Sequence, residues 1–351
     1  MSYEIRKKVL SPEELKEILP LTDKQKETIS QKRNELEKIL DGSDDRLLLI
    51  IGPCSAHNEK AVADYMTEIS KISKEVEDDI LVVPRIYTGK PRTKGKGYKG
   101  PTSQPDPLKP INFNEGLKMM RRMYIDAIDK GMIPADEMLN PNNYPYVEDA
   151  IGYIAIGARS VENQMHREVA SLVDVPVGMK NPTSGDLSVM MNALEAGIEA
   201  HTIMYQGNEV ATSGNPLTHI ILRGFNDDEG NHFPNYDKQT LHKIIRCHGK
   251  RDLENPVVVV DTNHSNSGKD YNLQEKIASS VMESRITLPG GSAIKGLMVE
   301  SYLVDGAQKL GEGEYVYGQS VTDPCIGLEK TKKLVDLLSE KQKEYRMLKS
   351  L

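Results

Sequence analysis

Apolar runs and amphipathic segments alternate through most of the chain, and the first long apolar run sets the pattern. Leu and Ile fill positions 47–51, and Gly52-Pro53-Cys54-Ser55 follow directly. A continuous apolar run closed by Gly-Pro predicts a strand that is buried on both faces, as in a parallel sheet. The cysteine therefore stands just past the carboxyl end of a strand, where parallel α/β proteins place their chemistry.

Seven further apolar runs follow, and most are separated by amphipathic helices. We predict strands at 80–86, 135–139, 153–159, 175–180, 220–223, 257–264 and 294–300. Helices are predicted at about 59–76, 114–130, 162–172, 186–196 and from 328 to the end. Eight strands alternating with helices favour an α/β fold of the (β/α)8 TIM barrel type. A doubly wound sheet is the alternative, although the turn at 52–55 is not a G-x-G-x-x-G turn.

Two segments depart from this alternation. Ser11-Pro12-Glu13-Glu14 and Thr22 with Gln25 have the pattern of capping boxes, and the second predicted helix runs to about Leu40 and stops at Gly42. Residues 1–44 are thus predicted to form a helical extension to a catalytic barrel of residues 45–351. The extension is a plug for the barrel, an oligomer arm or a regulatory segment. Residues 201–214 predict an inserted β-hairpin.

Composition excludes several classes of protein. The 351 residues carry a net charge of −7, which disfavours a general surface for nucleic acid or anionic membranes. The three cysteines form no C-x-x-C pair, so a disulfide framework is not expected. The first residues contain no apolar signal region, and no stretch approaches a membrane span. We therefore expect a cytoplasmic protein.

A chemically active side chain stands at or near the end of each predicted strand. In chain order these side chains are Cys54, Arg85, Glu137, Arg159, Lys180, Arg223, His264 and Glu300. A single arginine or histidine at such a position is usually a surface or structural residue. Eight at equivalent positions favour one shared site at the carboxyl end of a barrel.

Three of these residues have the chemistry of metal ligands. Cys54, His264 and Glu300 offer sulfur, nitrogen and oxygen, and Asp323, beyond the last strand, offers a fourth ligand. Such a mixed set suits Mn, Fe, Co or Zn better than Mg or Ca.

The remaining strand ends are mostly cationic. The cations at this predicted edge, with two from the adjacent loop, are Arg85, Arg159, Lys180, Arg223, Lys90 and Arg92. Each phosphate monoester carries a charge of about −1.5 to −2 at neutral pH, and arginine binds phosphate and carboxylate through two parallel hydrogen bonds. A substrate pair with two phosphates and a carboxylate fits this number of cations.

Eight short motifs together resemble the type I 3-deoxy-D-arabino-heptulosonate 7-phosphate (DAHP) synthases, in order from about residue 45 to the end. They are Gly52-Pro53-Cys54-Ser55, Lys90-Pro91-Arg92-Thr93, Gly157-Ala158-Arg159-Ser160, Gly178-Met179-Lys180-Asn181, Ile221-Leu222-Arg223-Gly224, His264-Ser265-Asn266-Ser267, Met298-Val299-Glu300-Ser301 and Thr322-Asp323-Pro324-Cys325. The chain departs from the family at Tyr98, where tryptophan is usual, and in its N-terminal segment, which matches poorly.

The resemblance implies a (β/α)8 barrel that condenses phosphoenolpyruvate with erythrose 4-phosphate at the start of the shikimate pathway. It implies one divalent metal, with Mn²⁺ as our first choice over Fe²⁺, Co²⁺ and Zn²⁺, on residues Cys54, His264, Glu300 and Asp323. Phosphoenolpyruvate is expected on Arg85, Lys90, Arg159, Lys180 and Arg223, and Ala158 is a further expected substrate-binding residue. Erythrose 4-phosphate is expected on Lys90, Pro91, Arg92 and Thr93. An aromatic amino acid inhibitor and a homodimer or homotetramer are further expectations.

Within this reaction we expect Lys180 to donate a proton and Glu137 to orient a water molecule, while Cys54 and His264 act through the metal. Three alternatives remain. The first is a related synthase that uses arabinose 5-phosphate, against which the Lys-Pro-Arg-Thr loop argues. The second is a Schiff-base aldolase that uses Lys180, and the third is a non-catalytic sensor of phosphorylated sugars.

Cys325 lies two residues after Asp323. If Cys54 and Asp323 bind one metal, Cys325 should lie near Cys54, and the two thiols should form a disulfide when the metal is absent. The alternative is a buried, small apolar residue that faces away.

Overall fold

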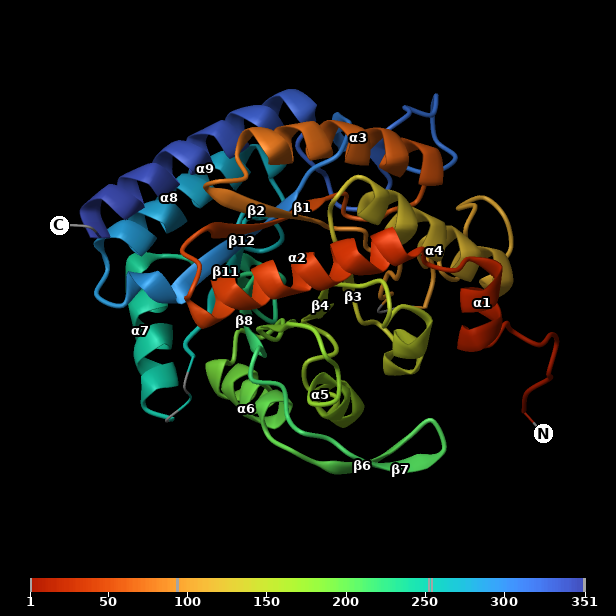
Figure 1. Ribbon diagram of the computed structural model, residues 1–351. Coiled ribbons are helices and arrows are strands. Elements are labelled where there is room, and N and C mark those ends of the chain that lie inside the picture. The colour runs from red at the N-terminus through yellow and green to blue at the C-terminus, as the bar shows by residue number, and fades with distance from the viewer. Residues whose placement is uncertain (1, 93–94, 252, 254, 350–351) are drawn as a thin grey trace.

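Eight parallel strands form a barrel in the computed structural model, which describes residues 2–92, 95–251, 253 and 255–349 (Figure 1). The strands are β1 (Leu47–Gly52), β2 (Ile80–Pro84), β3 (Ala135–Glu137), β4 (Tyr153–Ile156), β5 (Val177–Lys180), β8 (His219–Leu222), β11 (Val258–Asp261) and β12 (Ile294–Glu300). They pair in the order β2-β1-β12-β11-β8-β5-β4-β3. A parallel bridge between Arg85 and Ala135 joins the two ends of this order. The predicted TIM barrel is confirmed.

Helices surround the barrel, and two of them were not predicted. The outer helices are α3 (Glu59–Glu75), α4 (Phe113–Asp129), α5 (Gln164–Ala170), α6 (Leu187–Ile198), α7 (Lys238–Gly249), α8 (Gln274–Thr287) and α9 (Leu328–Lys349). The sequence analysis missed α7 and α8. Helix α8 buries Gln274, Ser284 and Arg285 as well as apolar side chains, so its sequence lacks a clean apolar stripe.

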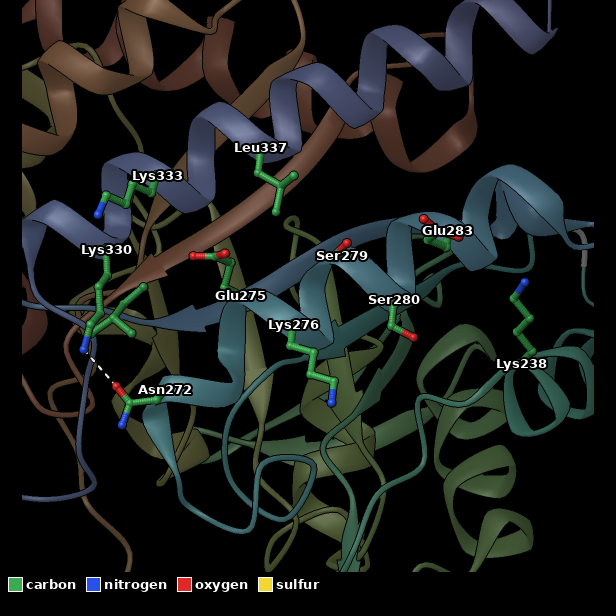
Figure 2. A pocket seen from close by; sticks show the side chains of 11 residues that line it. Lys238, Asn272, Glu275, Lys276, Ser279, Ser280, Glu283, Lys330, Lys333 and Leu337 are labelled. Carbon is green, nitrogen blue, oxygen red and sulfur yellow. Dashed lines mark hydrogen bonds between the residues drawn. The ribbon is translucent and has the colours of Figure 1, made fainter.

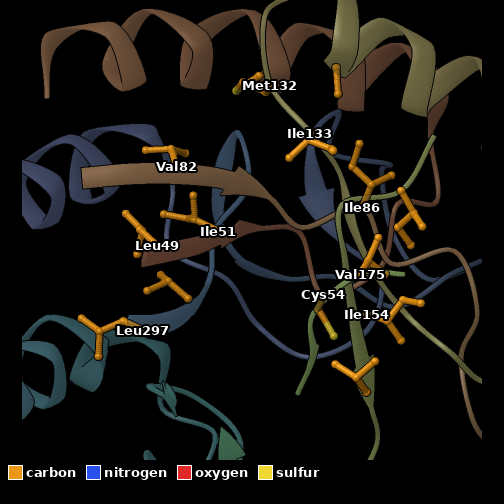
Figure 3. Close-up of a cluster of buried hydrophobic side chains, with 14 of the residues drawn as sticks. Leu49, Ile51, Cys54, Val82, Ile86, Met132, Ile133, Ile154, Val175 and Leu297 are labelled. Atoms are coloured by element: carbon orange, nitrogen blue, oxygen red, sulfur yellow. The ribbon is translucent and has the colours of Figure 1, made fainter. Parts of the chain in front are cut away.

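Alternate residues of each strand face opposite sides, and both sides are buried. In β1, Leu49 and Ile51 belong to the outer core under the helices, together with Val82 of β2 (Figure 3). Leu48 and Ile50 belong to a second core inside the barrel. Burial on both faces explains why the strands appear in the sequence as continuous apolar runs.

Helix α2 (Asp23–Asp41) closes the amino end of the barrel. It follows α1 (Pro12–Ile18), and both helices begin with the predicted capping boxes. Leu36, Ile39 and Leu40 of α2 are fully buried and join the core inside the barrel. Arg33 donates from Nε to the carbonyl of Ile151 at 3.0 Å. Of the three roles considered for this segment, the packing supports the plug, while the division of the chain at residue 44 remains a prediction.

Small antiparallel and parallel pairs lie outside the barrel sheet. The predicted hairpin is present as β6 (Thr202–Tyr205) and β7 (Asn208–Ala211), and it extends away from the barrel (Figure 1). The sequence analysis missed β9 (Phe225–Asn226) with β10 (His232–Phe233), and β13 (Val304–Ala307) with β14 (Gln319–Ser320). It also missed three short 3-10 helices, η1 (Pro141–Tyr146), η2 (Tyr271–Leu273) and η3 (Gly291–Ala293).

The plug predicts an unequal cost for two truncations on α2. Leu36→Ala should lower the free energy of unfolding by about 2–5 kcal/mol, because it opens a cavity under the barrel. Lys24→Ala, at an exposed position of the same helix, should change it by less than about 0.5 kcal/mol. Denaturant unfolding of both variants measures the difference. Equal costs would contradict the plug.

Candidate active site

The predicted site residues gather around one cavity at the carboxyl end of the strands. Its volume is about 580 Å³, and the predicted residues that line it are Arg85, Lys90, Pro91, Arg92, Glu137, Ala158, Arg159, Lys180, Arg223, His264 and Asp323. Cys54 and Glu300 are fully buried beside it, in contact with Lys90 and Arg85. Thr93 lies outside the described residues.

A larger groove, of about 850 Å³, lies elsewhere, between helices α7, α8 and α9 (Figure 2). Lysine and glutamate side chains line much of it, and Lys330 there donates to Asn272 at 2.8 Å. None of the residues predicted at the strand ends lines this groove. The smaller cavity is therefore the candidate active site.

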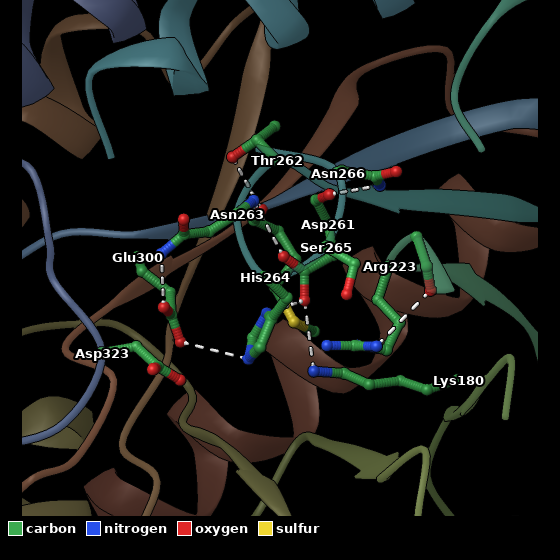
Figure 4. A network of polar contacts seen from close by, with 12 residues as sticks. Lys180, Arg223, Asp261, Thr262, Asn263, His264, Ser265, Asn266, Glu300 and Asp323 are labelled. Atoms are coloured by element: carbon green, nitrogen blue, oxygen red, sulfur yellow. Dashed lines mark hydrogen bonds and ion pairs between the residues drawn. The ribbon is translucent and has the colours of Figure 1, made fainter. Parts of the chain in front are cut away.

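Three potential metal ligands converge at that cavity. Cys54 Sγ and carboxylate oxygens of Glu300 and Asp323 all lie within 4.8 Å of one another. His264 is adjacent, with Nε2 3.7 Å from Glu300 Oε1 (Figure 4). We call these four side chains the ligand cluster. Its sulfur, nitrogen and oxygen donors suit a divalent transition metal, so the residues present fit the ion that the sequence predicted.

The surroundings orient the ligand cluster. Asp261 Oδ2 lies 2.8 Å from Nδ1 of His264, which leaves Nε2 directed to the cluster. His264 also has a left-handed backbone, with φ of +51°, a conformation that is uncommon for non-glycine residues and recurs at functional sites. Asn263 donates from Nδ2 to Glu300 at 2.6 Å, and Lys269 donates to Asp323 at 3.0 Å.

Neighbouring basic side chains lower the pKa of both carboxylates of the ligand cluster and so favour their ionised forms. Burial opposes the charge of Glu300, but Arg85 and His264 hold its pKa below the ordinary value. Burial likewise opposes the charge of Asp323, but His264 and Lys90 hold its pKa well below the usual range. Burial and Glu300 raise the pKa of the Cys54 thiol, and Lys90 opposes this rise. A bound cation would favour the thiolate over the thiol.

Cations form a second part of the cavity lining. Lys180 and Arg223 are buried, Arg159 is exposed at the rim, and Lys180 Nζ lies 3.2 Å from Asp261 Oδ2. Burial lowers the pKa of Arg223, and Asp261 opposes this effect. Such a lining is suited to phosphate and carboxylate groups.

Comparison with known proteins gives the family. Residues 20–336 match the model of the DAHP synthetase I family. The chain belongs to this family. Its relatives include the phospho-2-dehydro-3-deoxyheptonate aldolase of Corynebacterium glutamicum, with 37% identity over 94% of this chain and 90% of the relative. The Phe-sensitive enzyme of that name from Escherichia coli K12 is 38% identical over 97% of this chain and 96% of its own.

A solved structure of this family has the same architecture. The phospho-2-dehydro-3-deoxyheptonate aldolase of Francisella tularensis superposes with a TM-score of 0.90 and 34% identity, covering 97% of this chain and 99% of that one. In the part of the chain that the structure describes, no helix has the length and apolar character needed to cross a membrane.

Tyr98, where the chain departs from the DAHP synthase pattern, lies in the loop after β2. This side chain is 5% exposed. The backbone carbonyl of Tyr98 accepts a hydrogen bond from Nε of Arg92 at 2.6 Å. The backbone amide of Lys90 donates to the carbonyl of Lys99 at 3.0 Å. The tyrosine is thus a buried residue of the loop that positions Lys90 and Arg92 at the cavity.

Glu137 reaches the cavity because its neighbour is glycine. A Cβ atom at Gly157 would lie 2.4 Å from Glu137 Oε1, so a larger residue there would displace the carboxylate.

Several residues at the site were missed by the sequence analysis. Asp261 could have been predicted, since it is a carboxylate at the end of an apolar strand, but the prediction for that strand end names His264. Residues that follow the strands and had no signal of their own are Thr183, Asn226, His232, Asn263 and Lys269.

The predicted proximity of the two buried thiols is confirmed. The backbone amide of Cys54 donates to Sγ of Cys325 at 3.4 Å, and both side chains are fully buried. Cys325 therefore does not face away from Cys54.

This proximity predicts oxidation when metal is removed. Metal-free protein kept in air should lose the activity that Mn²⁺ otherwise restores, and it should form a Cys54–Cys325 linkage, because the second thiol can trap an oxidised first one. Mass spectrometry of an unreduced digest should find the linked peptide, reductant should restore activity, and Mn²⁺ should protect it. Cys325→Ser is the matched variant. If it loses activity as fast, with the same recovery, the pairing is wrong.

Proposed function

We propose that this protein is a DAHP synthase, which condenses phosphoenolpyruvate with erythrose 4-phosphate to give DAHP and phosphate, the first step of the shikimate pathway. The observation that carries the proposal is the single cavity in which a ligand cluster for one metal adjoins six cations, Arg85, Lys90, Arg92, Arg159, Lys180 and Arg223. Membership of the DAHP synthetase I family supports the same reaction.

The two substrates share one cavity, with Arg92 of the erythrose 4-phosphate loop and Arg223 of the phosphoenolpyruvate set assigned to opposite sides of it. Three strands lie between β2 and β8 in each direction around the barrel, so β2 and β8 are opposite each other. Phosphoenolpyruvate is assigned to Arg85, Lys90, Arg159, Lys180 and Arg223, and Ala158 is assigned to substrate binding without a choice between the two substrates. Erythrose 4-phosphate is assigned to the β2 loop, with Lys90, Pro91, Arg92 and Thr93.

One divalent metal is assigned to Cys54, His264, Glu300 and Asp323, with Mn²⁺ preferred over Fe²⁺, Co²⁺ and Zn²⁺. When bound, such an ion acts as a Lewis acid that polarises a carbonyl group. The carboxylates, held ionised by Arg85 and Lys90, keep the ligand cluster negatively charged and ready for a cation.

The side chains account for the remaining steps. C3 of phosphoenolpyruvate attacks the aldehyde carbon, and Lys180 donates a proton to the resulting alkoxide. Water, oriented by Glu137, adds to C2 and releases a proton that replaces the one given up by Lys180. The C–O bond to phosphate then breaks, the C2 hydroxyl becomes the carbonyl group, and its proton leaves with inorganic phosphate. Arg159 and Arg223 stabilise the charge that the departing phosphate takes up.

The alternatives have less support. Use of arabinose 5-phosphate would need a different sugar-binding loop from the Lys-Pro-Arg-Thr loop at 90–93. A Schiff base needs a free amine, whereas Lys180 makes an ion pair with buried Asp261. A sensor without activity would not need the ligand cluster.

We also propose feedback inhibition by an aromatic amino acid, because the E. coli relative is named Phe-sensitive. Assembly as a homodimer or homotetramer and a cytoplasmic location are parts of the same proposal.

The division of substrates predicts opposite kinetic effects in two variants. Arg92→Ala should raise the KM for erythrose 4-phosphate, and Arg223→Ala should raise that for phosphoenolpyruvate. Each loss of a charge-assisted phosphate contact should cost about 1.5–3 kcal/mol, roughly ten- to a hundredfold in KM. Steady-state kinetics with each substrate varied in turn measures both. Equal effects on both substrates in both variants would contradict the division.

A further inference from the structure

The β9–β10 hairpin forms part of the cavity rim, and the mechanism above does not use it. It follows Arg223 directly, between β8 and α7. Asn226 and His232 of this hairpin line the same cavity as Arg159, Arg223 and Thr183. The hairpin therefore places two polar side chains on the phosphoenolpyruvate side of the site.

Ring stacking within the hairpin and contacts with the segments after two strands hold it in place. The rings of Phe225 and Phe233 stack with centroids 5.3 Å apart and planes at 16°. The amide of Asn226 donates to the carbonyl of Thr183, after β5, at 2.8 Å. Gly224 has φ of +72°, and a Cβ there would lie 2.5 Å from the amide nitrogen of Asn266, after β11. The hairpin is thus a fixed part of the rim.

Hydrogen bonds in the hairpin determine which nitrogen of His232 carries hydrogen. Nδ1 of His232 lies 2.9 Å from Nδ2 of Asn226 and 3.1 Å from Oγ of Ser265. The Ser265 hydroxyl donates to Oδ1 of Asn226 at 2.8 Å, which sets the orientation of the amide. Because an amide nitrogen only donates, Nδ1 of the histidine must accept. The neutral ring therefore carries its hydrogen on Nε2.

This N–H group is available to a ligand. Among the residues that the structure describes, none hydrogen-bonds Nε2 of His232. His232 lines the cavity together with Arg159 and Arg223, and an imidazole N–H is a suitable donor to a phosphate oxygen. It can donate in the neutral ring, so the contact does not depend on protonation of the histidine.

The position of the hairpin indicates which of the two substrate phosphates His232 could contact. His232 is nine residues beyond Arg223, on the β8 side of the cavity, whereas Arg92, which is assigned to erythrose 4-phosphate alone, follows β2 on the opposite side. We propose that Nε2–H of His232 binds the phosphate group of phosphoenolpyruvate together with Arg159 and Arg223, and that Asn226 and Ser265 position the ring. This inference rests on the proposed function, because it uses the same division of substrates.

The test compares three variants of the full-length, metal-loaded protein. His232→Ala should raise the KM for phosphoenolpyruvate about tenfold, as expected for loss of one hydrogen bond to a charged group. His232→Gln should recover much of this loss, because its amide nitrogen can replace Nε2 as a donor. Asp228→Ala, at an exposed position in the turn of the hairpin, is the matched control and should match the wild type. The KM for erythrose 4-phosphate should stay within twofold in all three.

Two direct measurements complete the test. Calorimetric titration with phosphoenolpyruvate alone should show the same weakening in His232→Ala as the KM does. Nitrogen-15 NMR of the histidine rings should show hydrogen on Nε2 of His232 and a shift of that nitrogen on addition of phosphoenolpyruvate.

Several results would overturn the inference. One is normal phosphoenolpyruvate binding by His232→Ala. Another is an equal rise in both KM values with a lowered melting temperature, which would show a purely structural hairpin. A third is hydrogen on Nδ1. If the wild-type protein forms no DAHP, the proposed function fails and this inference fails with it. If the wild type is active and His232→Ala is indistinguishable from it, only the inference fails.

Discussion

The buried ion pair between Arg85 and Glu300 connects the two halves of the site. Nη1 of Arg85 lies 2.7 Å from Oε1 of Glu300, and the side chains are 1% and 0% exposed. They come from the ends of β2 and β12, which both pair with β1. Removing one partner of a buried pair typically costs about 3–5 kcal/mol, because the other charge is left uncompensated. The geometry of the cavity therefore depends on both residues being present.

This pair marks the boundary between opposite charges. On one side are Glu300, Asp323 and the thiol of Cys54, close enough together to share one cation. On the other side, cations from the ends of β2, β5 and β8 face the cavity. The ligand cluster, which is suited to a metal ion, and the cationic side chains, which are suited to phosphate groups, thus adjoin the same cavity. This arrangement accounts for a reaction between two phosphorylated substrates better than either half does alone.

The sequence predicts those parts of the fold that depend on local pattern. Continuous apolar runs such as 47–51 identify strands buried on both faces, and Ser11 and Thr22 mark the starts of the first helices. Helix α8 could not be predicted in this way, because it buries polar side chains such as Gln274 and Arg285 against the barrel. The role of α2 also needed the structure, since only tertiary packing places Leu36 inside the barrel.

The same distinction between local pattern and tertiary contacts applies to the residues of the candidate site. Residues at strand ends, such as Cys54 and Lys180, are predictable because the position of a strand end on a barrel is fixed by the topology. Asp261 contacts His264 and Lys180, and these contacts can be seen only in the three-dimensional structure. His232 lies on a short hairpin with no alternating apolar pattern, so the sequence offered no reason to select it.

The central claim is that the ligand cluster and the cations beside it serve one condensation reaction. Release of inorganic phosphate from phosphoenolpyruvate tests this claim most directly. With Mn²⁺ present, phosphate should appear only when erythrose 4-phosphate is added, in equal amount to the DAHP formed. EDTA should stop the release, and fresh Mn²⁺ should restore it. Equal phosphate release without the sugar phosphate, or full activity in verified metal-free protein, would contradict the account.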